Sequence, residues 1–308
     1  MSESSLRRLR LTVLNISVIT KLIRGGGYRM TKNTNPDIFK PIAVPDSIKP
    51  YIRRALVADT KELVDMTVDV RATGYHYLGW LWRGDWLGTV NGETAFDSKT
   101  DGPLILTGQI GKRVVTSRWQ GDIGQIYFEF TALGRYQLLG SKGMHSASAP
   151  QVLNPALAPY FERVFEAEDL TTTARITLLA DVLSALPKHP VPDDIAAAIE
   201  RIEAVDGKIR IAELVREIGL SDRQFRAVFE KLTGLSPKAF CKTLQINRAF
   251  NQLLVNNGGD LAGIADQSGF SDQAHFTRVF GDFLGKAPLA YLENVEATLA
   301  RFLGQSRK

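Results

Sequence analysis

The chain has few of the residues that mark a secreted, disulfide-bonded or membrane-spanning protein. Of its 308 residues, one is cysteine and four are histidine. The single cysteine, Cys241, permits no internal disulfide and fits a reducing compartment. An apolar stretch at residues 11–23 is interrupted by Lys21 and is too short to span a bilayer. We therefore expect a cytoplasmic protein with no membrane partner.

The sequence also has few signs of catalytic or cofactor chemistry. No set of nucleophile, base and orienting group can be recognised. The glycines at residues 25–27 are not followed by the lysine and hydroxyl spacing of a nucleotide-binding loop. His76 and His145 lack the His-x-His and glutamate pattern of barrel metal sites. The sequence therefore predicts no enzyme activity, no cofactor and no metal.

The net charge of +5 comes from the start of the chain. Residues 1–36 hold seven basic residues against Glu3 alone, and we expect them to be a disordered leader. Met30 is a plausible alternative start for the native protein. The remaining composition, with 44% hydrophobic and 23% charged residues, is ordinary for a chain long enough to form two domains.

Two stretches near the C-terminus, residues 211–240 and 261–291, repeat each other. The matched pairs are Gly219 and Gly269, Ser221 and Ser271, Phe229 and Phe280, Gly234 and Gly285, Pro237 and Pro288, and Phe240 and Tyr291. The spacing changes by one residue just after the serine. Because a repeat indicates architecture before any residue is interpreted, we expect two copies of one structural unit.

Each copy predicts a helix-turn-helix. A short helix with apolar residues three and four positions apart ends at Gly219 or Gly269, because glycine readily adopts the left-handed conformation. Ser221 and Ser271 are expected to cap the second helix. The residues expected on its buried face are Phe225, Phe229 and Leu232 in the first copy and Phe276, Phe280 and Phe283 in the second. The opposite, polar face is the one that such units place in the major groove of DNA.

A long helix is expected to join the two copies. Ser236 and Pro237 are typical of a helix start, residues 239–254 contain no glycine or proline, and residues 256–259 end the pattern. This helix would hold the two units at a fixed separation.

The polar faces carry the candidate DNA contacts. Arginine reads guanine with two hydrogen bonds, and basic residues neutralise phosphates. The candidates are Ser221, Arg223, Arg226, Lys231 and Lys238 in and after the first copy, and Gln273, Thr277 and Arg278 in the second. A solvated helix face is the alternative interpretation of these residues.

Charge distinguishes the two copies. Residues 208–258 hold nine basic and four acidic residues, whereas residues 259–300 hold two basic and six acidic residues. Because phosphate neutralisation supplies most sequence-independent affinity, we predict that the first copy anchors the complex and the second tunes it.

Residues 195–292 resemble the DNA-binding domain of the AraC/XylS family of bacterial transcription regulators. The resemblance rests on the Gly-Leu-Ser-Pro motif at residues 234–237 and on the run GFSDQAHFTRVFGDFLGKAP at residues 269–288. It implies two helix-turn-helix units that read adjacent major grooves, with RNA polymerase as a partner and activation as the commoner outcome. The family usually has arginine or lysine directly after the phenylalanine that matches Phe280. This chain has Gly281 and Asp282 there, which predicts a weaker phosphate contact.

The N-terminal half is predicted to be rich in β-structure. Residues 75–82, 104–106, 114–116 and 126–130 read as strands, and Asn91-Gly92 and Asp101-Gly102 as hairpin turns. This pattern favours a small sandwich or barrel, and the resemblance implies a cupin-like barrel that senses a small molecule. The expected fold class is therefore α+β.

Aromatic residues of this half suggest a binding pocket. All four tryptophans of the chain lie there. The residues that could line an apolar ligand pocket are Tyr75, Tyr77, Trp80, Trp82 and Trp119. The other interpretation is that they form the core of the domain.

The expected layout has five parts. These are the leader (1–36), a regulatory domain (37–186, β-rich at 41–140 and helical at 150–186), a proline-rich linker (187–192), the DNA-binding domain (193–295) and a C-terminal tail (296–308). An apolar stripe at residues 178–183 either pairs two subunits or packs on its own domain.

These features predict a sequence-specific DNA-binding transcription regulator, an activator, whose N-terminal domain senses a small molecule or mediates homodimerisation. Its expected partners are double-stranded DNA, RNA polymerase, a small-molecule effector and a second copy of the chain. An architectural DNA binder without a ligand, or a barrel enzyme with an attached helical domain, would be the alternatives.

Overall fold

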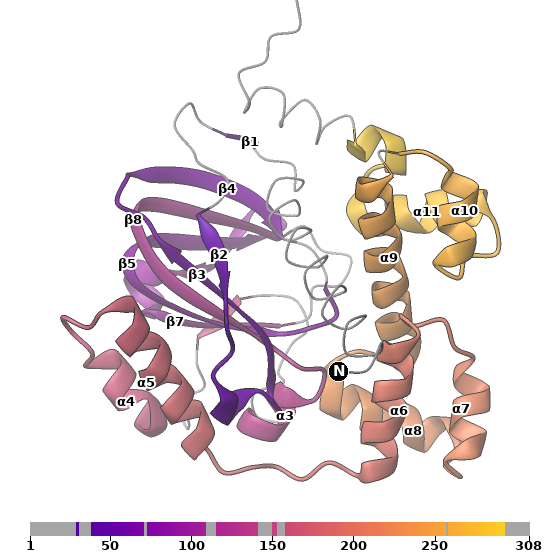
Figure 1. Ribbon diagram of the computed structural model, residues 1–308, viewed down its shortest axis with the longest axis horizontal. Coiled ribbons are helices and arrows are strands. Elements are labelled where there is room, and N and C mark those ends of the chain that lie inside the picture. Colours follow the sequence, from indigo (N-terminus) through magenta and orange to yellow (C-terminus); the bar gives the residue numbers. More distant parts are fainter. Residues whose placement is uncertain are drawn as a thin grey trace, which may run out of the picture.

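The computed structural model describes residues 29–30, 38–70, 73–108, 115–140, 150–152, 158–256 and 258–292. In these residues an antiparallel sheet is followed by a helical region (Figure 1). The α+β architecture confirms the expected fold class. Most of the predicted leader, His145 and the predicted C-terminal tail lie outside the described residues.

The described strands form one nine-stranded sheet. They are β1 (Arg29–Met30), β2 (Phe39–Ile42), β3 (Ile52–Asp59), β4 (Val64–Val70), β5 (Tyr77–Val90), β6 (Glu93–Asp97), β7 (Leu104–Thr107), β8 (Val115–Phe130) and β9 (Pro150–Val152). The long strands β5 and β8 pair along most of their length, apart from register shifts near residues 81–85. β3 pairs with the second part of β8 and β4 with the first part, so these two strands share one edge of β8. On the outer edge of β5, β7 pairs with the beginning and β6 with the end.

The two long strands bend in the middle, which divides the sheet into two halves. Gly84 and Gly121 lie at the bend with φ of +82° and +95°, a region that disfavours other residues. A Cβ built on Gly121 would lie 3.6 Å from the Cα of Gly84, so the two backbones pass close together there. Among the described strands, the pairing does not close into a barrel.

The bend creates two apolar cores on opposite sides of the sheet. The inner core joins residues of both halves: Ile38, Phe39, Ala58, Val64, Met66, Leu81, Trp86, Phe96, Ile105, Trp119 and Ile123. The outer core lies between one half of the sheet and the helices α4 (Ala158–Phe165) and α5 (Thr172–Ala185). Thr171 caps α5 by accepting a hydrogen bond from the backbone N–H of Ala174. The stripe that begins at residue 178 thus packs on its own domain.

The C-terminal region is helical. Its helices are α6 (Asp193–Ala204), α7 (Ile211–Glu217), α8 (Asp222–Thr233), α9 (Pro237–Val255), α10 (Leu261–Gln267) and α11 (Gln273–Leu284). The short elements of the first half are η1 (Asp46–Ile48), α2 (Ser98–Asp101) and α3 (Gly134–Leu139). None of the described helices is long and apolar enough to cross a membrane.

Some strand predictions were wrong in extent. The segments at 114–116 and 126–130 belong to one strand, β8, and β5 begins at Tyr77 and continues to Val90. Asn91 and Gly92 form the predicted hairpin turn, with φ of 53° and 89° between the paired strands β5 and β6. The turn at residues 101–102 instead ends the short helix α2.

Candidate nucleic-acid interface

The first unit has the predicted helix-turn-helix geometry. Helix α7 ends before Gly219, whose φ of +71° is the left-handed conformation expected there. Ser221 caps α8, and Gln224 completes a capping box by accepting a hydrogen bond from the backbone N–H of Ser221. Phe225 and Phe229 are buried on the inner face of α8. Recognition helix α8 is therefore fixed both at its start and along its apolar face.

The outer face of α8 is polar and accessible. Ser221, Arg223 and Arg226 are exposed. Arg226 donates to Glu230 one turn later, at 3.0 Å, in a surface pair that stabilises the helix only weakly. No carboxylate of the described residues forms an ion pair with Arg223. This face thus offers two arginine side chains to solvent.

The second unit repeats this geometry with one difference at the cap. Gly269 has φ of +79° and follows α10, as predicted. The prediction that Ser271 caps α11 is wrong, because Asp272 accepts the hydrogen bond from the backbone N–H of His275, at 2.7 Å. The one-residue shift of the repeat moves the start of α11 by one position. Ser271 donates instead to Asp272, and its hydroxyl also lies 3.0 Å from Nδ1 of His275.

The N-terminal end of α11 borders an open depression in the surface. The residues that line it are Ser271, Asp272, Ala274, His275 and Arg278. The backbone N–H of His275 holds the pKa of Asp272 below its ordinary value, and the Ser271 hydroxyl adds to this effect. A carboxylate therefore caps α11, whereas neutral Ser221 caps α8 and the acidic residue of that helix's first turn, Asp222, follows one position later. Gln273 and Arg278 are exposed, and Thr277 is half-buried.

Helix α9 holds both units. Its first half contributes Phe240 and Leu244 to the core that contains α8, and its second half contributes Phe250 and Leu253 to the core that contains α11. The two recognition helices lie toward opposite ends of α9 (Figure 1). Nineteen residues of α-helix span roughly 28 Å, which is close to the 34 Å of one DNA turn.

Polar contacts further fix the two units relative to each other. Lys208, before α7, donates to the backbone carbonyl of Gln267 at the end of α10, at 3.2 Å. Gln245 of α9 donates to the carbonyl of Gly207, at 3.1 Å. These bonds connect the start of the first unit to α9 and to the second unit. Lys231 and Lys238 are exposed near the first unit, where they add positive charge.

The five aromatic residues of the predicted ligand pocket lie in different places. Trp80 is buried in the outer core and Trp82 packs against it. Trp119 is buried in the inner core, and Tyr77 contacts it indirectly through Tyr127. Tyr75 lies in the core of the first helix-turn-helix unit. The structure therefore does not gather these five side chains around one pocket, and four of them are core or partly buried core residues of the sheet domain.

The physical reason is the alternation of side chains along β5. Successive residues of a strand point to opposite faces, so Trp80 and Trp82 face α5 whereas Tyr77 faces the other side. Arg175 of α5 lies over the rings of Trp80 and Trp82 at 5.2 and 5.3 Å. Trp80 and Trp119 are core residues, as the alternative interpretation expected.

His76 is buried near the start of β5. Burial, and then the charge of Arg135, hold the pKa of His76 well below its ordinary value, so its ring stays neutral. Within the described ranges, no three histidine, cysteine, aspartate or glutamate residues gather as metal ligands would.

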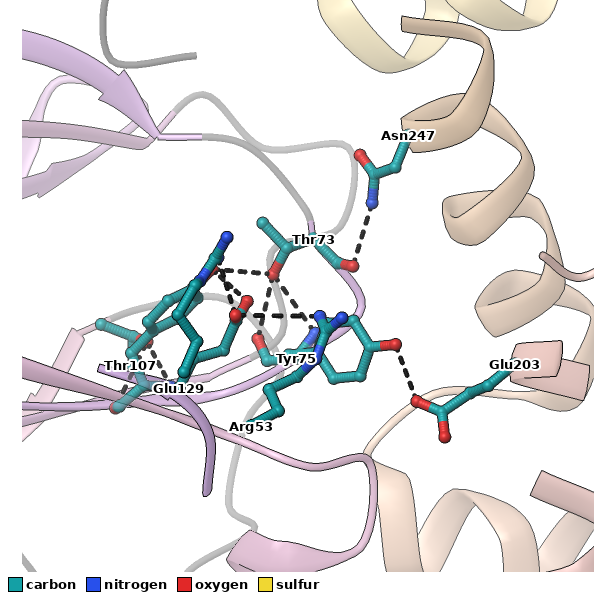
Figure 2. Close-up of polar contacts among 9 residues, drawn as sticks. Arg53, Thr73, Tyr75, Thr107, Glu129, Glu203 and Asn247 are labelled. Carbon is teal, nitrogen blue, oxygen red and sulfur yellow. Dashed lines mark hydrogen bonds and ion pairs between the residues drawn. The ribbon is translucent and has the colours of Figure 1, made fainter. Parts of the chain in front are cut away.

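Sequence reasoning missed a group of residues between the sheet and the first unit. Tyr75 donates a hydrogen bond to Glu203 of α6, at 2.7 Å, and Asn247 of α9 donates to the carbonyl of Thr73, at 2.9 Å (Figure 2). Glu203 was not among the residues that the sequence singled out. No local signal pairs it with a residue 128 positions away.

The match to a protein family lies in the C-terminal third of the chain. Residues 214–294 match a family model described as a helix-turn-helix domain. The transcriptional activator Btr of Bacillus subtilis is 31% identical over 97 residues, which are 32% of this chain and 18% of that protein. The regulator ExsA of Pseudomonas aeruginosa is 32% identical over 79 residues, 26% of this chain and 28% of ExsA. The Msm operon regulatory protein of Streptococcus mutans is 27% identical over 88 residues, 29% of this chain and 31% of that protein. The match thus spans less than a third of each of these three relatives.

A solved structure of ToxT from Vibrio cholerae superposes with a TM-score of 0.41 and 14% sequence identity, covering 76% of this chain and 96% of ToxT. A similarity of that size does not establish a shared fold for the whole molecule. The family model and the named relatives agree with the residue pattern and with the geometry of α7 to α11. Residues 214–294 are therefore a helix-turn-helix domain of the AraC type.

Proposed function

We propose that the chain is a sequence-specific DNA-binding transcription regulator whose α8 and α11 enter adjacent major-groove faces of one DNA duplex. The observation that carries this proposal is the pair of exposed, polar recognition helices on the two ends of one continuous helix, α9. A single polar helix would also fit a solvated surface. Two of them, each behind a glycine turn and packed toward opposite ends of a helix roughly 28 Å long, support binding to adjacent major-groove faces.

The two units contribute unequally in this proposal. The first supplies Arg223 and Arg226 for base edges and Lys231 and Lys238 for phosphates. The second supplies Gln273, Thr277 and Arg278, but residues 259–300 hold only two basic residues against six acidic ones. The second unit therefore neutralises fewer phosphates, so the first unit anchors the complex.

The N-terminal sheet domain regulates DNA binding in this proposal, by sensing a small molecule or by pairing two copies of the chain. RNA polymerase is the expected second partner, with activation as the outcome, since relatives such as Btr are named activators. The protein acts in the bacterial cytoplasm, where the DNA is accessible, and it does so without catalysing a reaction.

The test begins with selection of bound sequences from a random pool of DNA duplexes by the full chain. A site with two blocks of preferred bases about one helical turn apart is expected. Because Arg226 pairs with Glu230, Arg223→Ala is tested beside Arg226→Ala. At least one of these two variants should weaken binding to that site by roughly 5- to 150-fold, and Arg278→Ala should weaken it by less. Arg163→Ala, on the exposed face of α4, is the control and should leave affinity unchanged.

Failure to enrich any sequence would contradict specific recognition. A larger loss from Arg278→Ala than from both first-unit variants would show that the second unit is the anchor.

A further inference from the structure

The segment between β4 and β5 enters the core of the first helix-turn-helix unit. Gly74 has φ of +87°, and a Cβ built there would lie 3.4 Å from Thr243 and 3.5 Å from Phe240, so its backbone passes against α9. Asn247, one turn further along α9, donates to the carbonyl of Thr73. Tyr75 follows and packs edge-to-face on Phe240, with the ring centroids 6.2 Å apart. Figure 2 shows this segment between the sheet and the helices.

Tyr75 connects charged groups of the two domains. Its hydroxyl donates to the carboxylate of Glu203 on α6, and the guanidinium of Arg53 on β3 lies 3.8 Å from the centre of its ring. Burial raises the pKa of Glu203, which the hydrogen bond from Tyr75 and the charge of Arg53 only partly offset. A buried carboxyl with one hydrogen-bond donor depends strongly on that donor. The contact between the domains is thus a partly buried polar bond.

The same contacts continue into the sheet (Figure 2). Arg53 and Arg54 pair with the buried carboxylate of Glu129 at 3.7 and 2.7 Å. Tyr77 donates to Glu129 at 2.5 Å, and its ring lies against that of Tyr127. Because Tyr127 in turn contacts Trp86 in the inner core, an unbroken series of contacts joins the interior of the sheet to α6.

The second unit has no equivalent attachment among the described residues. The core of the first unit includes Tyr75 and Ala132, and Leu133 and Tyr136 pack against it. All four belong to the N-terminal domain. The core of the second unit is composed only of residues 246–292, from α9 onward. The N-terminal domain therefore forms part of one reading unit and not of the other.

Resting on the proposed function, we propose that Tyr75 and Glu203 form the joint through which the N-terminal domain positions the first recognition helix, while the second recognition helix lies outside its control. Tyr75 is a positioning residue, because it acts on α8 through α6 and α9 and does not contact DNA. A change inside the sheet would reach the anchoring unit through Glu129, Arg53 and Tyr75, and would alter affinity for half of the DNA site.

The first arm of the test uses no DNA. Amide hydrogen exchange is measured on the full chain and on Tyr75→Phe, which keeps the ring and removes the hydroxyl. Exchange in α6 and α8 should accelerate about tenfold, and exchange in α11 should not change. Tyr160→Phe removes a hydroxyl from the exposed face of α4 and should change neither.

Two substitutions of the partner separate the hydrogen bond from packing. Glu203→Gln keeps an oxygen acceptor for Tyr75 and should leave exchange in α8 within about twofold of the parent. Glu203→Leu removes the acceptor and should reproduce the effect of Tyr75→Phe. If Tyr75→Phe accelerates hydrogen exchange equally in α8 and α11, or in neither helix, the proposed joint is contradicted.

The second arm measures binding to duplexes that carry only one of the two half-sites. Tyr75→Phe should weaken binding at the first-unit half-site at least fivefold and leave the second-unit half-site unchanged. Faster exchange in α8 with unchanged half-site binding would overturn control by the N-terminal domain. If the parent chain selects no DNA, the proposed function fails, while the exchange arm still decides whether the joint exists.

Discussion

At the scale of single residues, the two recognition helices begin in chemically different ways. Ser221 caps α8 with a neutral hydroxyl and takes part in a capping box with Gln224. Asp272 caps α11 with a carboxylate, although the matching serine is present one position earlier. The repeat therefore conserves the fold of the two units and an aspartate at the start of each recognition helix, but not the residue that caps it.

The cap positions give a prediction on stability. Ser221→Ala removes the hydroxyl that accepts the hydrogen bond from the backbone N–H of Gln224, and should lower the free energy of unfolding by about 1 kcal/mol. Ser271→Ala removes a serine that caps nothing, and should change it by less than about 0.5 kcal/mol. Urea titration followed by far-ultraviolet circular dichroism measures both. Equal losses would show that Ser271, and not Asp272, begins α11.

The positions of some residues could be predicted from the sequence, and those of others could not. Ser221, Gly219 and Gly269 were predictable because turn and cap chemistry is local. Tyr75 was assigned to a ligand pocket because its neighbours are aromatic and lie in a strand pattern. It lies before β5, outside the alternation, and its partners Glu203 and Phe240 come from the other domain. A contact between residues so distant in the chain leaves no pattern in one sequence.

At the scale of elements, the sheet depends on the bend in β5 and β8. Short stretches of β-pattern predicted two strands at 114–116 and 126–130, because the glycines at 121 and 124 interrupt the pattern. These glycines lie within β8, and Gly121 is at the bend. A glycine between two strand patterns is consistent with a turn or with a bend, and pairing with a second strand decides between them.

The bend gives a prediction that separates steric crowding from backbone conformation. A Cβ on Gly84 would lie 2.6 Å from Cδ1 of Ile123 and 2.8 Å from the carbonyl oxygen of Asp122. Gly84→Ala should therefore lower the free energy of unfolding of the sheet by roughly 3 kcal/mol. Gly92→Ala has a similar φ of +89° but meets nothing within 4 Å, and should cost about 1 kcal/mol. Urea denaturation followed by tryptophan fluorescence reports on the sheet, which contains all four tryptophans. Equal losses would mean that the close contact at Gly84 carries no cost.

The C-terminal helices were predictable at this scale because each is delimited by local signals. A serine or aspartate caps the start of α8 to α11, a glycine lies at or just after the end of α7, α8, α10 and α11, and the apolar residues recur every three or four positions. Helix α9 was expected from the absence of glycine and proline, and it runs from Pro237 to Val255. Its division into two halves that pack different units needed the tertiary structure, because its apolar residues form one continuous pattern.

At the scale of the whole molecule, the first unit has both the larger positive charge and the attachment to the N-terminal domain. That unit carries most of the positive charge of the helical region, and its core includes residues of the sheet domain. The second unit is acidic and is held by α9 and by Lys208. Regulation through the sheet would therefore act on the unit that supplies most of the affinity.

The salt dependence of binding tests this distribution of charge. Each lysine that neutralises a phosphate contributes about 0.9 to the slope of log affinity against log salt concentration. Lys231→Gln together with Lys238→Gln should therefore reduce the slope by about 2 and weaken binding across DNA sequences without changing the preferred site. Lys286→Gln, near the second unit, should reduce the slope by less, and Lys61→Gln, in the sheet domain, should leave it unchanged. A slope that falls by about 0.9 with Lys286→Gln, as much as each lysine of the double variant contributes, would show that both units bind the phosphates equally, and the first unit would then not be the electrostatic anchor.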